Sequence, residues 1–454
     1  MKNQSKLTGT KGFGLWYTLG AVIMGALLCG MLWRFRGSHG WGGESGVFNA
    51  GYVMLLFFAL ITGSNKKTTP LKIAITSAAF ILTTPQWGTI NSQICGVISN
   101  GDDPLITGVS TGSAIFMMLM LGFTMVGLYS LLLGNIFSEK QWKIHHYIII
   151  VAVFFAVQYI CKASVAHPIL KLIQPVSEKS FNDALIADKG ITTGVYKAYL
   201  AHFDNVSWAK KIAGGRNYFA EIELISRFIA VVACIFVTRF AFKDKTCAKL
   251  GTFVCLSFAI GITVADLFFY FFSSTGKGID ISFIPAWSSW EYFTGFISGG
   301  LATFFVLKFG KLNIQKEYSL SFLPAKAYNI VNYLVGICLP FAFNLARPVI
   351  MRFDDSSLQI FVAAAIIAFI LFAVIFTGIK SKLQFEKMQI NHYFAAAFLT
   401  VLIIQTAVYF FGAGENGAIR EELSLPNVCV VISFIPAVIF AIAKYLKRKG
   451  AKLN

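Results

Sequence analysis

The chain has 454 residues, of which 56% are hydrophobic, 13% are charged and 45 are phenylalanine. A soluble globular protein of this size carries about twice that share of charged residues, so the composition excludes that class and favours an all-α polytopic membrane protein. The net charge of +18 does not indicate a nucleic-acid partner, because the basic residues stand between apolar segments and not in a polar domain. We expect them to act as topology signals.

Twelve segments are long and apolar enough to cross a bilayer, which requires about 20 mostly apolar residues per helix. They are residues 13–33, 47–63, 71–90, 112–135, 145–163, 219–242, 249–272, 289–308, 324–345, 357–379, 391–411 and 427–446. The first is longer than the apolar part of a signal peptide and is followed by no A-x-A-like cleavage site, so we expect it to be retained. Pro85 and Trp87 interrupt the third.

The basic residues orient these segments. With the amino terminus in the cytoplasm, 24 of the 39 Lys and Arg residues fall on the inner side, with only four acidic residues. The positive-inside rule then predicts about twelve transmembrane helices with both termini cytoplasmic, in a bacterial-type inner membrane. The chain divides into spans 1 to 5 with a glycine-rich outer loop, one larger extracytoplasmic segment, spans 6 to 12 and a basic cytoplasmic tail. These are residues 1–163, 164–218, 219–446 and 447–454.

The extracytoplasmic segment is the only sizeable aqueous piece. Apolar side chains recur in it at helical spacing from Val195 to Val206. This pattern predicts an amphipathic helix that lies on the outer membrane surface or caps the bundle.

The eight cysteines form no C-x-x-C pair and lie mostly inside apolar segments. Their spacing is not that of a disulfide framework or a zinc site, so we expect small buried side chains. We expect neither a metal nor another cofactor. The cysteines are Cys29, Cys95, Cys161, Cys234, Cys247, Cys255, Cys338 and Cys429.

Residues 33–46, which follow the first apolar segment, combine charged and aromatic side chains with five glycines. Guanidinium groups are suited to bind carboxylate or phosphate, and an imidazole with a nearby carboxylate is a minimal acid–base set. We expect two residues, His39 and Glu44, to act as acid or base and three to bind substrate. These three are Arg34, Arg36 and Trp41.

Two alternatives apply to this stretch. A lone loop histidine is more often simply solvated, and one histidine with one carboxylate is too few ligands for zinc. The glycines resemble a dinucleotide fingerprint superficially, but no strand precedes them.

The sixth and seventh segments each carry a charged residue at a similar depth, near the outer side. Arg227 and Asp266 are therefore expected to pair and to contribute to a binding site, or to be purely structural. Glu223 stands four residues before Arg227, so these two residues can instead satisfy each other on one helix face.

The eighth segment begins with aromatic residues and a carboxylate. Trp287 and Trp290 fit an interfacial aromatic belt and are candidates to contact substrate, while Glu291 is a candidate helix cap or base. Gly295 and Gly299 form a small-x-x-x-small face for close helix packing. After the ninth segment, Arg347 adds to the positive charge of the outer side.

These unusual residues gather on one side, which favours a membrane-embedded transferase of glycosyl or acyl type acting on a lipid-linked or anionic envelope substrate. A secondary transporter of an anionic solute or sugar is the first alternative, and a non-catalytic envelope assembly subunit is the second. A continuous polar path to the inner face indicates transport. A cavity closed below Arg227 and Asp266 indicates an enzyme.

Overall fold

The computed structural model describes residues 14–37, 44–63, 69–84, 111–173, 218–272, 283–310, 327, 330–332, 334–338, 340, 390–411 and 424–446. Every regular element within these ranges is helical. The elements are α1 (Leu15–Arg36), α2 (Glu44–Thr62), α3 (Pro70–Thr83), α5 (Thr111–Met125), α6 (Gly127–Ile136), α7 (Ile144–Ser164), α8 (Ala166–Ile173), α11 (Tyr218–Phe236), η2 (Val237–Ala241), α12 (Lys245–Ala265), α13 (Leu267–Phe272), α14 (Ala286–Phe309), η3 (Leu334–Cys338), α18 (Ile390–Phe411) and α19 (Leu425–Leu446).

Six of the described helices are long and apolar enough to cross a membrane, and the pair α5 and α6 makes a seventh if it is one span with a 46° bend. Ten of the twelve predicted segments coincide with described helices, although α3 has only 14 residues. The predicted span 357–379 and most of 324–345 lie outside the described residues, as do the tail 447–454 and the helix predicted around Val195. An all-α chain with several candidate membrane spans is therefore confirmed, and the number twelve stays a prediction.

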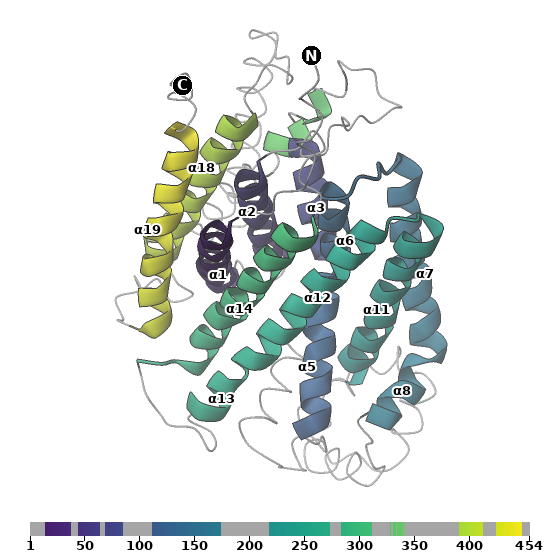
Figure 1. Cartoon of the computed structure of the whole chain (residues 1–454). Helices are drawn as coiled ribbons and strands as arrows, with labels where there is room; N and C mark the ends of the chain where they lie inside the picture. Colours follow the sequence, from purple (N-terminus) through teal and green to yellow (C-terminus); the bar gives the residue numbers. More distant parts are fainter. Residues whose placement is uncertain are drawn as a thin grey trace, which may run out of the picture.

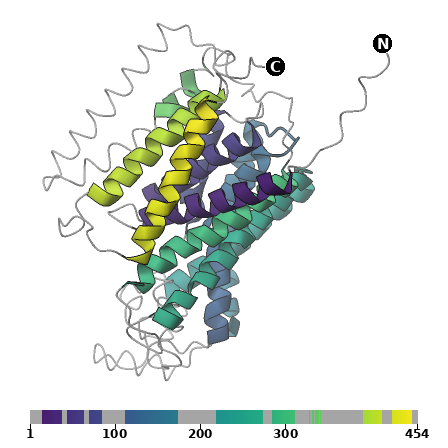
Figure 2. The ribbon, with the colours of Figure 1, turned by 60° about the vertical axis from the view of Figure 1, so that its left-hand side comes forward.

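The helices α1, α12 and α14 form the middle of the bundle, with α18 and α19 on one side and α7, α8 and α11 on the other (Figure 1). Helix α1 lies along α14 (Figure 2). A side chain at Gly295 or Gly299 would overlap Cys29 of α1, so the predicted small-residue face does bring two helices into close contact.

At one end of the bundle, Asp244 precedes α12 and connects neighbouring segments through hydrogen bonds. Its carboxylate accepts hydrogen bonds from the Cys247 backbone N–H at 3.0 Å, the Trp142 indole at 3.0 Å and the Ser138 hydroxyl at 2.5 Å. The first of these bonds caps α12. Asp244 therefore joins the start of α12 to the segment between α6 and α7.

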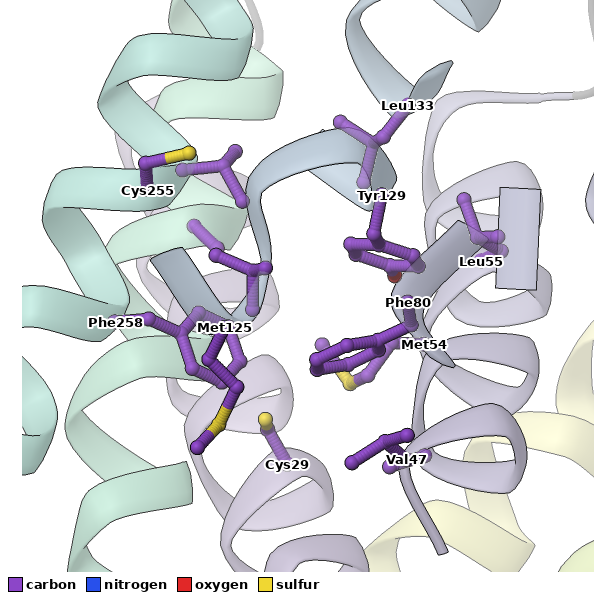
Figure 3. Packing of buried hydrophobic residues seen from close by; sticks show 14 of the residues in the cluster. Cys29, Val47, Met54, Leu55, Phe80, Met125, Tyr129, Leu133, Cys255 and Phe258 are labelled. Atoms are coloured by element: carbon purple, nitrogen blue, oxygen red, sulfur yellow. The ribbon is translucent and has the colours of Figure 1, made fainter. Parts of the chain in front are cut away.

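The centre of the bundle is apolar and close-packed. In Figure 3, Phe80 and Tyr129 lie beside each other and face Phe258, with Cys29 below them. The Phe80 ring centre lies 5.0 Å from that of Tyr129 and 6.3 Å from that of Phe258. A cavity of about 20 Å³ remains between these side chains, which is room for about one water molecule.

Candidate functional site

At one end of the bundle, α1 and α18 end while α14 and α19 begin, and we call this the Arg34 end. Arg34 Nη1 forms an ion pair with Glu291 Oε2, which joins α1 to α14. Arg34 Nε donates to the Tyr409 hydroxyl at 3.0 Å, and this hydroxyl donates to Asn427 Oδ1. Four helices that are far apart in the sequence thus meet through one hydrogen-bonded chain.

Burial makes this chain of bonds energetically important. Arg34 is 7% exposed and Glu291 is 8% exposed. A charged group withdrawn from water is tolerated only with a partner and further hydrogen bonds. Beside the pair, the hydroxyls of Tyr292 and Ser433 lie 2.8 Å apart and tie α14 to α19 again.

Gly37, the residue directly after α1, leaves the space that the Glu291 carboxylate occupies. A Cβ atom at Gly37 would overlap both carboxylate oxygens. The backbone of Gly37 has an ordinary right-handed helical φ of −76°, so glycine is required here for close approach and not for its conformational freedom.

Arg36 brings a second guanidinium to the same place. It is 1% exposed, and its Cζ lies 4.4 Å above the centre of the Trp33 ring, a cation–π contact. Arg36 is also within electrostatic range of Glu291. One guanidinium from the last turn of α1 thus pairs with the Glu291 carboxylate and a second lies within its electrostatic range, which is an arrangement suited to an anionic group.

The aromatic residues at the start of α14 serve different roles. Trp290 is fully buried, and its indole donates to Asp266 Oδ1 at 2.7 Å. Asp266 is the C-cap of α12, so this bond ties α12 to α14. Trp287 is 48% exposed and makes an edge contact with Trp290 at 6.1 Å. Of the two tryptophans, only Trp287 presents a surface to a substrate.

Arg227 does not belong to this cluster. It pairs with Glu223 at 2.5 Å on its own helix and donates to the Thr84 carbonyl at 2.7 Å. The expected Arg227–Asp266 pair is not formed, because α11 packs mainly against α7 and α5 whereas Asp266 faces α14. The alternative pairing within one helix is the one that the structure contains.

Three predicted site residues, His39, Trp41 and Arg347, lie outside the described residues. Glu44 is the first residue of α2, and its side chain is likewise outside the description. The acid–base pair proposed for His39 and Glu44 therefore remains a prediction. The structure brings together Arg34, Arg36 and Glu291 of the predicted set.

The sequence does not indicate Tyr409 or Asn427 as members of the cluster, and it marks Gly37 only as one of the five glycines of residues 33–46. Tyr409 is one aromatic residue in a strongly apolar run and carries no distinguishing signal. Asn427 could have been noticed, since it is a polar residue near the start of a predicted span.

A second buried polar cluster lies at the opposite end. Lys72 is 1% exposed, and its ammonium donates to Asn135 Oδ1 at 2.6 Å, close to Asp244. Between the two clusters, the described cavity is lined almost entirely by apolar and aromatic side chains, from Trp33 to Tyr129. At this cavity, the space between the polar groups of the two ends is thus apolar.

In the parts of the chain that the structure covers, no three His, Cys, Asp or Glu side chains gather as metal ligands. The six cysteines whose side chains the structure describes are free thiols. Comparison with protein-family models, with curated proteins and with solved structures found no match for the chain.

Proposed function

We propose that this chain is a polytopic membrane protein whose Arg34 end binds the anionic group of a lipid-linked or envelope substrate, and that it acts as a transferase of glycosyl or acyl type. The observation that carries the proposal is the buried Arg34–Glu291 ion pair with the second guanidinium of Arg36 within electrostatic range. Guanidiniums bind phosphate and carboxylate through paired N–H groups. Glu291 occupies the position that a substrate anion would take.

Substrate binding would then be an exchange of anions. A phosphate or carboxylate of the substrate replaces Glu291 on Arg34, and the released carboxylate takes the proton of an acceptor hydroxyl. The acceptor oxygen forms a bond to the transferred glycosyl or acyl carbon. The bond from that carbon to its leaving group breaks, and the electron pair leaves with the departing group, which the guanidiniums stabilise.

The predicted outer loops complete the proposed site. His39 and Glu44 are candidates to exchange protons with the acceptor, while Trp41 and Trp287 are candidates to stack on sugar or acyl surfaces. Arg347 adds a further positive charge. These roles are part of the proposal and extend the described cluster.

The proposed orientation places the Arg34 end outside and both termini in the cytoplasm, with twelve spans in a bacterial-type inner membrane. The distribution of lysines supports it. The opposite end of α12 and α14 carries Lys245, Lys249 and Lys308, as the positive-inside rule requires of a cytoplasmic face.

A secondary transporter of an anionic solute or sugar is the second candidate. The observation in its favour is the 46° break between α5 and α6, since interrupted helices often line transporter sites. The apolar lining of the cavity between the two polar clusters favours the one-sided transferase. A non-catalytic assembly subunit would need neither arrangement.

The test is a binding titration of the detergent-purified protein with a polyprenyl phosphate. We expect Arg34→Gln and Arg36→Gln to weaken binding at least tenfold, because each removes a charge-assisted contact. Glu291→Gln should bind more tightly than the wild type, since the internal competitor is gone. Arg227→Gln is the matched control, because its guanidinium lies on α11 outside the cluster.

The Glu291 variant separates binding from structure. If the cluster only holds helices together, Glu291→Gln lowers stability and does not raise affinity. Unchanged affinity in all three variants of the cluster would overturn the proposal.

A further inference from the structure

We propose that the end of α12 and α14 opposite to Arg34 holds the headgroup of an anionic phospholipid between Lys249 and Lys308, with an acyl chain lying along α12. The inference is independent of the transferase proposal and shares with it only the membrane environment. It concerns side chains that take no part in the Arg34 cluster.

The two lysines share one aromatic ring. Lys249 Nζ lies 3.9 Å from the centre of the Phe309 ring, and Lys308 Nζ lies 5.5 Å from the same centre. Lys308 Nζ also lies 5.1 Å from the Phe304 ring centre. The ammonium groups of α12 and α14 therefore lie close to the same ring.

Both ammonium groups retain their N–H donors for a ligand. Each lysine is exposed, and neither forms a hydrogen bond or ion pair with another described residue. The nearby carboxylate of Asp244 is buried and engaged by the Ser138, Trp142 and Cys247 donors described above. The positive charge of this pair of lysines is therefore available to an anion.

Aromatic rings pack between the two helices next to the lysines. Phe253 of α12 packs against Phe305 and Phe309 of α14, with ring centres 4.6 and 4.9 Å apart. These rings are half-buried. They offer an apolar surface directly below the charged groups, as in an interfacial aromatic belt.

An exposed apolar stripe continues from these rings along α12. After Lys249 and Phe253, the side chains of Leu256, Ile260 and Val264 follow at helical spacing, and these three are 39%, 42% and 42% exposed. Helices α12 and α14 lie side by side in both overall views (Figures 1 and 2). Charge at one end and an apolar stripe below it match the two parts of an anionic lipid and not those of a soluble anion.

The experiment measures lipid binding to the detergent-purified full chain by native mass spectrometry. The wild type should bind phosphatidylglycerol at least tenfold more tightly than phosphatidylcholine. Changing both residues, Lys249→Gln with Lys308→Gln, should weaken phosphatidylglycerol binding about thirtyfold, from roughly fivefold for each lysine. Arginine at both positions should retain binding.

Lys245→Gln is the matched control, because Lys245 is exposed in the first turn of α12 and has no ring contact of this kind. The double glutamine variant should still bind polyprenyl phosphate at the Arg34 end like the wild type, so the failure of this proposal and that of the transferase proposal are separable.

A measurement on the unaltered protein avoids any folding defect of the variants. Phosphatidylglycerol should protect Lys249 and Lys308 from acetylation by an amine-reactive reagent, whereas phosphatidylcholine should not. Three results overturn the proposal: equal acetylation in both lipids, wild-type affinity in the double glutamine variant, or equally tight binding of glycerol phosphate without acyl chains.

Discussion

Gly37 offers a sharp test of how the Arg34 end is built. Replacing it with alanine adds one methyl group at a position where a Cβ atom overlaps the Glu291 carboxylate. The backbone is not an obstacle, because its φ of −76° suits any residue. The only expected effect is therefore to push Glu291 away from Arg34.

The size of the effect follows from burial. Removing one partner from a buried ion pair costs about 3 to 5 kcal/mol, and both partners are less than one tenth exposed, so this is the upper limit for displacing Glu291. Where no steric conflict exists, glycine to alanine stabilises by about 0.4 to 1 kcal/mol. In a Glu291→Ala background the carboxylate is absent, so Gly37→Ala should be neutral or stabilising.

The two changes thus form a double-mutant cycle with an expected coupling of about 3 kcal/mol. The free energy of unfolding in mixed micelles measures each corner of the cycle. Gly20→Ala is the control on the same helix, because a Cβ atom there meets nothing within 4 Å. Equal costs of Gly37→Ala with and without Glu291 would refute this account of the site.

Three further changes test neighbouring contacts. Tyr409→Phe removes the hydroxyl that accepts from Arg34, and should lower the free energy of unfolding by about 1 to 2 kcal/mol while polyprenyl phosphate binding persists; an equal loss of binding would show that the hydroxyl positions the guanidinium. Trp290→Phe removes the indole that donates to Asp266, and should lower the free energy of unfolding by about 1 to 3 kcal/mol. An unchanged free energy of unfolding would mean that this hydrogen bond does not stabilise the protein. Exchanging the charges of Arg34 and Glu291 should not restore wild-type stability, because each charge would then oppose its helix dipole by about 0.3 to 1 kcal/mol; full recovery in the unfolding titration would contradict this.

The apolar segments and the charged residues within them could be predicted from the sequence, since both depend on composition along one helix. Asp266 and Glu291 were found in this way, whereas Arg34 was found from the composition of residues 33–46, the first part of which lies in α1. Their partners were not, because counting residues from a helix end gives depth but not the direction of a side chain. The predicted partner of Asp266 was Arg227 of α11. The structure shows that Asp266 accepts a hydrogen bond from Trp290 of α14.

Contacts between distant parts of the chain were the least accessible. The Arg34–Glu291 pair joins residues 257 positions apart, and the bond from Arg34 to Tyr409 spans 375 positions. Only the packing of α1, α14, α18 and α19 defines these neighbours. By contrast, the Glu223–Arg227 pair is local, and its spacing of four residues was sufficient to predict it.

Helix direction explains why the charges of the Arg34 end have the signs observed. Arg34 and Arg36 lie in the last turn of α1, where the partial charge of the helix is negative, and Glu291 lies in the second turn of α14, next to the positive first turn. The two helices run in opposite directions and are held close by glycines, so both favourable ends coincide at one place. An incoming anion at that place meets the same positive helix start and the same guanidiniums as Glu291 does. The geometry that stabilises the internal ion pair is thus also the geometry that would accept a substrate anion in its place.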